Sequence, residues 1–521
     1  MEEEDYVNKP CSLHDCLALQ VAEESLCDTR NSVYPMYDLE SSVSSSAHNL
    51  LSFGSSQSYT TTNNNSKEQM GLQISPSSTF YYDFFRQYTE DARDHSPNNT
   101  KEKKKNRCTE EDSPFTQERS QVIKKKKKKK KPNDRQQDFM VEKFDDLKSL
   151  LTKCAEAVAG FDRRTVNDLL MQIRQRSSPQ GDAIERIAHY FANALQARFA
   201  GTVSYVVFKL NRILIAEISK IYETYITACP FKKMSNYLAN KTIEKLAIGA
   251  TTLHIIDFGI LYGYQWPCLI EALSQIPGGP PKLRITGIDF PQPGSHPAET
   301  IEDTGHRLGE YCRRFGVPFE YNAIAKKWDT IRVEDVRIEK NELIAANSLY
   351  RLHNVLDEAV RVSGPRDDVL RLIKKINPDM YVYGAVSGTY NTPFFVPRFR
   401  EAFFHLYSIF DMFDATTPRQ DENRLRIEQT LGEQAFNVIA CEGTARIERP
   451  ETYKQWQVRH MRAGFMQIRF DQEIVKHVRS KVRMDYHKEF SVEEDEKWML
   501  QEWKGRVILA ISCWQPAPQL N

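Results

Sequence analysis

The chain has 521 residues and a formal net charge of +1, which conceals a strong segregation of charge along the sequence. Residues 1–100 carry 15 acidic and 5 basic side chains, residues 101–136 carry 15 basic and 6 acidic ones, and the long remainder is nearly neutral. This remainder lacks the basic surplus of a typical nucleic-acid-binding domain, whereas its length allows a large core. The ten cysteines are scattered without a C-x-x-C pair, and no apolar run approaches about 18 residues, so we expect an intracellular protein with no disulfide framework, metal site or membrane span.

Residues 1–140 are expected to form a disordered N-terminal region, because they are rich in Ser, Thr and Asn and poor in apolar side chains. One stretch within them, TFYYDFFRQYTED, holds six aromatic residues among acidic ones. This composition suits a segment that folds onto a partner protein, and it suits an idle piece of tail equally well.

Two basic clusters lie within residues 101–135 of this region. The first is KEKKKNR, and the second is a run of eight lysines: Lys124, Lys125, Lys126, Lys127, Lys128, Lys129, Lys130 and Lys131. Identical charges repel one another and stay solvated, so an import receptor can reach them. We therefore predict a nuclear import signal. A solvated linker and non-specific, salt-dependent contact with phosphates are the alternatives.

Apolar periodicity predicts helices from Phe144 onwards. Leu147, Leu150, Leu151, Cys154 and Val158 follow the spacing of one helix face, and further helices are predicted around Leu169, around Phe191, over Ile213–Ile226 and over Phe231–Leu246. They give an all-helical block before the first strand. LKSLL also matches the LxxLL pattern of groove-binding helices, but its leucines coincide with the helix's own apolar stripe, so we expect them in the core.

The stretch LHIIDFGILYGYQW begins an alternation of strands and helices. Strand, glycine turn and helix form the first βα unit, and KLRITGIDF is the second strand. PFEYNAIAKKW, ELIAANSLYRL and MYVYGAVSG follow as strands, with IRVEDVRI and DDVLRLIKKI as helices between them, and a long helix, RFREAFFHLYSIFDMFD, comes next. A last strand is predicted from Val507 to Cys513, with core positions for Trp498, Trp503 and Trp514. The pattern predicts an α/β fold: a doubly wound, mostly parallel, Rossmann-like sheet with a helical cap.

A ligand crevice is expected where the first two strands end, if one exists. Its candidate residues are Asp257, Gly259, Gly263 and Asp289. The glycines are spaced G-x-x-x-G rather than the G-x-G-x-x-G that lets backbone approach a pyrophosphate. Tyr262 and Tyr264 occupy a loop that should be bare, which indicates a filled or reshaped site. We therefore favour a structural turn over a cofactor pocket, and expect no cofactor and no catalytic residue.

The order of these motifs resembles the GRAS family, which includes the plant scarecrow-like proteins. Leu253, His254, Ile255, Ile256 and Asp257 fill the positions of its VHIID motif, with Leu in place of the opening Val. The resemblance divides a GRAS-like domain over 144–517 into five parts: leucine-rich region I (144–204), the VHIID region (223–288), leucine-rich region II (304–336), the PFYRE region (345–439) and the SAW region (442–517).

The resemblance implies a helical cap on a core like that of S-adenosylmethionine-dependent methyltransferases. It also implies a nuclear regulator or co-regulator of transcription that is not an enzyme. Other transcription factors and other GRAS proteins would be its partners, as homo- or heterodimers, and it would meet DNA directly or through those partners. Two alternatives stay open. One is a methyltransferase that holds S-adenosylmethionine in the crevice, and the other is a sensor that binds another small molecule there.

Overall fold

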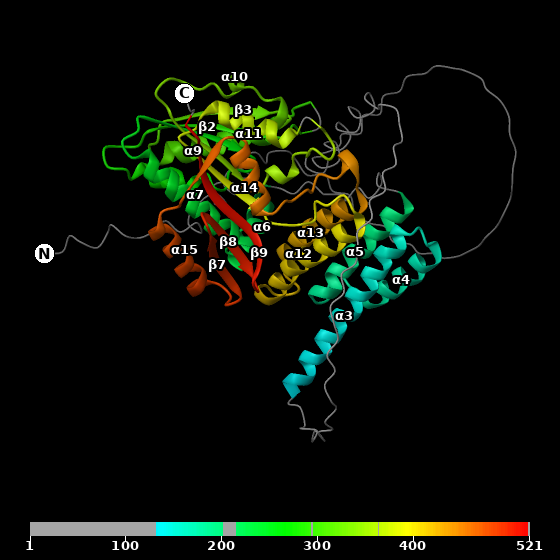
Figure 1. Ribbon diagram of the computed structural model, residues 1–521. Coiled ribbons are helices and arrows are strands. Elements are labelled where there is room, and N and C mark those ends of the chain that lie inside the picture. The colour runs from blue at the N-terminus through cyan, green and yellow to red at the C-terminus, as the bar shows by residue number, and fades with distance from the viewer. Residues whose placement is uncertain (1–131, 202–214, 293–294, 363, 519–521) are drawn as a thin grey trace, which may run out of the picture.

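The computed structural model describes residues 132–201, 215–292, 295–362 and 364–518. Five helices form a bundle beside a large sheet (Figure 1): α3 (Pro132–Ala159), α4 (Arg163–Arg176), α5 (Ala183–Ala200), α12 (Phe395–Thr416) and α13 (Glu422–Ala440). Because α3 begins at Pro132, residues 132–140 are helical and do not belong to the disordered region predicted. The N-terminal end of α3 projects past the other helices of the bundle (Figure 1). The aromatic acidic stretch and the predicted import signal lie outside the described residues.

The bundle is a helical cap held by an apolar core and by well-formed helix ends. The leucines of LKSLL are buried in this core, as predicted, together with Phe191, Phe403 and Phe410. Asp182 and Glu185 form a reciprocal capping box at the start of α5, which satisfies backbone donors that the first helical turn leaves free. Helices α12 and α13 follow the fifth strand in the chain, so the cap is assembled from two separate parts of the sequence.

Within the described residues the sheet has nine strands, and eight of them follow the order β3-β2-β1-β4-β5-β9-β8-β7. The first five run parallel in the doubly wound arrangement: β1 (Thr252–Phe258), β2 (Lys282–Asp289), β3 (Phe319–Ala325), β4 (Leu343–Leu349) and β5 (Met380–Val386). The order reverses between β1 and β4, which is where such sheets place their ligands. The predicted Rossmann-like core is confirmed.

The other four strands are antiparallel to their neighbours and extend the sheet beyond β5: β6 (Phe465–Ile468), β7 (Phe490–Asp495), β8 (Trp498–Trp503) and β9 (Arg506–Pro516). The last strand, β9, is longer than the predicted Val507–Cys513. Trp498 and Trp503 lie at the two ends of β8, a strand that the apolar periodicity did not predict. Both of these tryptophans and Trp514 are fully buried, so the prediction that they close the core is confirmed.

Helices cover both faces of the sheet. One face packs against α7 (Phe231–Ala247), α8 (Trp266–Ser274), α9 (Glu299–Arg314) and α15 (Gln472–Asp485). The other packs against α11 (Pro365–Ile376) and α14 (Tyr453–Arg462), with Trp328 of the short helix η1 (Trp328–Thr330) in the same core. The stretch IRVEDVRI, predicted as a helix, forms only the single turn α10 (Val333–Val336).

The helical block before the first strand is divided between the cap and the sheet. α7 contributes Phe231, Leu238 and Ile243 to the core under the sheet rather than to the cap. α6 (Ile215–Ala228) packs against α13 and α7. The long helix α12 packs against both the cap and the sheet, because Phe403 lies in the core of the cap and Phe413 lies in the core beside the sheet. None of the helices in the described ranges has the length and hydropathy that crossing a bilayer requires.

Candidate functional site

The motif strand β1 places its apolar side chains in both cores. Leu253 and Ile255 belong to the core on the side of α7 and α8, and Ile256 belongs to the opposite core. All three are fully buried, so they hold the strand within the sheet and do not line a crevice. The two polar members of the motif, His254 and Asp257, are also buried and have separate surroundings.

His254 lies away from the carboxyl edge of the sheet. Its Nδ1 is 2.9 Å from Oε2 of Glu342, just before β4, and its Nε2 is 2.8 Å from the Thr286 hydroxyl on β2. Burial lowers the pKa of His254, and the neighbouring Glu342 carboxylate opposes that shift. The imidazole ring of His254 therefore joins β1 to β2 and to the residue that precedes β4, which is a structural role.

Asp257 lies at the carboxyl end of β1 with both carboxylate oxygens engaged. Trp266 Nε1 donates to Oδ2 at 2.9 Å, and Asn347 Nδ2 donates to Oδ1 at 2.8 Å. The side-chain amide of Gln265 in turn bonds to Asn347. Burial raises the pKa of Asp257 to about 7, these two hydrogen bonds oppose the shift, and the nearby charge of Asp289 adds to it.

The two loop glycines make room for side chains of the chain itself. Gly259 has φ +107°, and a Cβ at that position would collide with the Arg351 side chain. Gly263 has φ +72°, and a Cβ there would lie 2.8 Å from Cγ2 of Thr304. In a dinucleotide site the space above such glycines admits a pyrophosphate. Here the close approach is made by Arg351 and Thr304.

Asp289, at the end of β2, is also occupied. Its Oδ1 accepts from Arg351 Nη2 at 3.0 Å and from the backbone N–H of Phe290 at 2.8 Å. Its Oδ2 accepts from the backbone N–H of Leu261 at 3.2 Å. In nucleotide-binding sheets an acid at this position meets ribose hydroxyls. The Arg351–Asp289 ion pair takes that place and joins the end of β2 to the segment after β4.

The loop tyrosines pack against neighbouring helices. Tyr264 stacks on Tyr222 of α6 with ring centroids 4.6 Å apart, and its hydroxyl lies 2.9 Å from that of Ser219. The backbone carbonyl of Tyr262 accepts from Arg307 Nη2 of α9 at 3.3 Å. The loop after β1 is thus a docking point for two helices, α6 and α9.

Sequence reasoning did not identify Arg351, Asn347 or Trp266 as parts of this site. Asn347 had a usable signal, because it is polar near the carboxyl end of a predicted buried strand, next to the strand order reversal. Arg351 had no comparable signal, since an arginine two residues beyond a strand is ordinary. Its partner Asp289 is 62 residues away in the chain.

A chain of hydrogen bonds connects the crevice to the segment before α14. Arg351 Nη1 donates to Oδ1 of Asn354 at 3.2 Å, and Asn354 Nδ2 donates to Oε1 of Glu448 at 3.1 Å. Oε2 of the same carboxylate lies 3.1 Å from Nε2 of His353. The loop after β1, the turn after β4 and the segment before α14 are therefore held together by one buried polar network.

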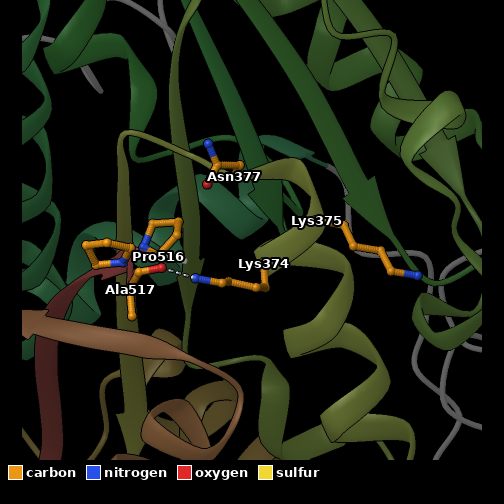
Figure 2. Close-up of a pocket in the computed structure, with 6 residues that line it drawn as sticks. Lys374, Lys375, Asn377, Pro516 and Ala517 are labelled. Atoms are coloured by element: carbon orange, nitrogen blue, oxygen red, sulfur yellow. Dashed lines mark hydrogen bonds between the residues drawn. The ribbon is translucent and has the colours of Figure 1, made fainter. Parts of the chain in front are cut away.

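A surface pocket of about 560 Å³ lies elsewhere, beside the start of β5 and the end of β9 (Figure 2). It is lined by Lys374, Lys375, Asn377, Pro516, Ala517 and Pro518. Lys374 Nζ donates to the backbone carbonyl of Ala517 at 2.8 Å across it. Because β5 begins here, the pocket is at the edge of the sheet opposite to the crevice. Within the ranges that the structure covers, no three His, Cys, Asp or Glu side chains are grouped to hold a metal ion.

Comparison with known proteins identifies the family to which the chain belongs. Residues 147–515 match the model of the GRAS domain family. Scarecrow-like protein 14 of Arabidopsis thaliana is 52% identical over 376 residues, which are 71% of this chain and 49% of that protein. Scarecrow-like protein 9 of the same plant is 53% identical over 374 residues, 71% of this chain and 52% of that protein.

The chain thus spans about half the length of these curated relatives. The crystal structure of SCL7 from Oryza sativa superimposes with a TM-score of 0.61 at 28% identity and covers 71% of this chain and 99% of that one. Three findings agree: the family model matches most of the described residues, two relatives are about 50% identical, and a solved structure shares the fold. The chain belongs to the GRAS domain family, whose scarecrow-like members are plant transcriptional regulators.

Proposed function

We propose that this chain is a nuclear regulator of transcription that acts by binding other proteins and not by catalysis. The observation that carries the proposal is the occupied crevice. Asp257 is engaged by Trp266 and Asn347, and Asp289 by Arg351, so the positions that would hold a cofactor serve to join strands and helices. A Rossmann-like core whose crevice is occupied can still present surfaces that bind other proteins. Membership in the GRAS domain family supports transcription as the process that this binding regulates.

The methyltransferase alternative would require the crevice to open. A bound S-adenosylmethionine would have to displace Arg351 from the space above Gly259 and to replace its ion pair with Asp289. Both side chains are nearly buried, so the displaced charges would need new partners. We expect no heat of binding when the full chain is titrated with millimolar S-adenosylmethionine. Saturable binding that the Arg351→Ala variant strengthens would favour the methyltransferase or the small-molecule sensor.

Nuclear entry is assigned to the lysine run Lys124–Lys131. The full chain fused to a fluorescent protein should accumulate in the nucleus, and replacement of the eight lysines by glutamine should reduce the nuclear fraction. A second variant that also changes KEKKKNR tests whether the two clusters share the task. Unchanged nuclear accumulation of the double variant would refute the import signal. Replacement of the two lysines of α15, Lys476 and Lys481, by glutamine shows whether loss of lysines elsewhere on the chain also lowers the nuclear fraction.

Action on transcription is tested by recruiting the chain to a reporter promoter through a foreign DNA-binding domain. A change in transcript level supports the proposal, and no change with the protein present in the nucleus contradicts it. Direct reading of DNA is a separate question. Selection from a random duplex library at physiological salt distinguishes a chain that enriches one sequence from a co-regulator that depends on DNA-binding partners.

A further inference from the structure

The two outer edges of the sheet differ in how they are covered. At one edge, α15 packs beside β7, and Arg479 Nε donates to the backbone carbonyl of Val492 at 3.1 Å. Arg479 Nη2 also pairs with Glu494 of the same strand at 3.0 Å. At the other edge lies β3, which pairs with β2 alone among the residues that the structure describes. The edge at β7 is therefore protected by a helix, whereas the edge at β3 presents backbone groups to which another strand can bind.

The register of β3 against β2 shows which of its backbone groups point outwards. The carbonyl of Pro318, just before β3, accepts a hydrogen bond from β2 at 2.8 Å, and the N–H of Lys326, just after β3, donates one to β2 at 3.2 Å. The direction of these groups alternates along a strand, so even-numbered residues point towards β2. Tyr321 and Ala323 therefore direct their N–H and C=O groups away from the sheet. Both residues are only partly buried.

Helices cover the two faces of β3 and leave the edge between them. On one face the ring of Tyr321 packs against Gly305 of α9. On the other face Asn322 Nδ2 donates to the backbone carbonyl of Asp335 in α10 at 3.0 Å. Odd-numbered and even-numbered side chains thus point to opposite faces, as they do in a regular strand. The outward backbone groups lie between these two layers and meet no further strand in the described ranges.

Two charged side chains restrict which strand can pair with this edge. Glu320 lies near the start of β3 and Lys326 directly after its end, and both are about half exposed. Their ion pairs with Lys282 and Asp335 lie at the surface, where such pairs contribute little free energy. Charges at a sheet edge discourage pairing with an arbitrary strand. An antiparallel copy of β3 itself is different, because its reversed sequence brings opposite charges together.

We propose that β3 is a self-association surface, which joins two copies of the chain edge to edge in antiparallel orientation. With Ala323 on the two-fold axis, Glu320 of each copy faces Lys326 of the other, and Tyr321 faces Ala325. The bulky Tyr321 thus meets a small side chain, each acid meets a base, and the outward backbone groups of the odd-numbered residues pair. Moving one copy by two residues in either direction separates the opposite charges. This surface is independent of the role in transcription proposed above.

The test combines sedimentation velocity of the full chain over a range of concentrations with hydrogen exchange of the Tyr321 and Ala323 amides. We expect reversible dimers, and we expect exchange at both amides to slow as the concentration rises. Ala323→Pro removes an outward N–H and no hydrogen bond within the chain, so the variant should fold. Its dissociation constant should rise at least tenfold, because a proline at this position cannot donate to the second copy.

Charge reversal tests the register independently. Glu320→Lys places a lysine opposite Lys326 at two symmetric positions, and Lys326→Glu places a glutamate opposite Glu320 in the same way. Each variant should weaken dimerisation about tenfold, and the double variant, which restores opposite charges, should recover it. Lys476→Glu is the control for a reversed charge elsewhere, at a 77% exposed lysine of α15, and should dimerise like the unchanged chain.

Three results would overturn the proposal. The first is a chain that stays monomeric at every concentration. The second is a dimer that Ala323→Pro and both charge reversals leave unchanged, because such a dimer uses another surface. The third is slow exchange of the Tyr321 and Ala323 amides that does not depend on concentration, since a segment of the same chain then covers the edge. If Ala323→Pro does not fold, the two charge reversals and their double variant decide.

Discussion

Replacement of Asp257 by asparagine tests the motif at its most unusual position. Burial raises the pKa of this carboxyl from 3.8 to about 7 in the folded chain, whereas in the unfolded chain it returns to the ordinary value. The folded state therefore holds its proton more tightly. The stability that this group contributes is complete below pH 4 and is lost as pH rises through 7.

The magnitude follows from the shift. About three pKa units at about 1.4 kcal/mol each give ~4 kcal/mol over the whole window, of which roughly 2–3 kcal/mol falls between pH 5 and pH 8. Asp257→Asn cannot ionise, so this part of the pH dependence should vanish. Between pH 5 and pH 8 the free energy of unfolding of the unchanged chain should therefore fall by about 2–3 kcal/mol more than that of the variant.

The assay is guanidinium unfolding of the full chain and of the variant at pH 5 and pH 8, followed by circular dichroism. Asp485→Asn, at a half-exposed carboxylate on α15, is the matched control and should keep the original pH dependence. The reasoning is refuted if Asp257→Asn loses stability between pH 5 and pH 8 as steeply as the unchanged chain does. That result would mean that Trp266 and Asn347 stabilise the ionised form enough to cancel the effect of burial.

Three further substitutions test packing and charge, each by its unfolding free energy against a matched control. Gly259→Ala should cost about 1–3 kcal/mol more than Gly278→Ala, because both have positive φ but only Gly259 lies against Arg351. The difference should shrink in an Arg351→Ala background, which removes the contact with Cγ of Arg351 and keeps the contact with its Cβ. Glu428→Gln should cost about 3–5 kcal/mol, since it leaves the fully buried Arg186 and Arg424 without this carboxylate, whereas Glu310→Gln at an exposed pair should cost at most about 1. Phe191→Ala should cost about 3–5 kcal/mol, because its ring packs edge-on against Phe399 and Phe403, whereas Phe161→Ala, 84% exposed, should change stability by no more than about 0.5. Equal costs within any pair would contradict the corresponding argument.

Local patterns predicted the parallel half of the sheet well, for a physical reason. A buried parallel strand is a continuous apolar run, and the helix after it is amphipathic. Each βα unit can therefore be recognised from about 30 residues of sequence. β3, β4 and β5 lie within the predicted stretches. The antiparallel extension was less visible, because β8 and β9 meet in a tight hairpin whose strands are buried on both faces and show no alternation.

The candidate site shows a different limit. The sequence placed Asp257 and Asp289 at the ends of adjacent strands, and the charge of Asp289 does reach Asp257 in the structure. The spacing of the glycines and the two tyrosines also indicated a filled or reshaped crevice. It did not reveal what fills it, because Arg351 and Asn347 come from strand β4 and the turn after it, nearly a hundred residues further along the chain.

The sequence by itself determined the division of charge, the order of strands and helices, the apolar stripe of α3 and the family to which the motifs belong. These properties depend on neighbours within a few turns of the chain, where periodicity and turn chemistry act. Only the tertiary structure decided that α12 and α13 complete the cap and that Arg351 closes the crevice. It alone decided that Arg186 meets Glu428 across 242 residues. Such pairings depend on where distant segments converge, and burial then gives each of them its energetic weight.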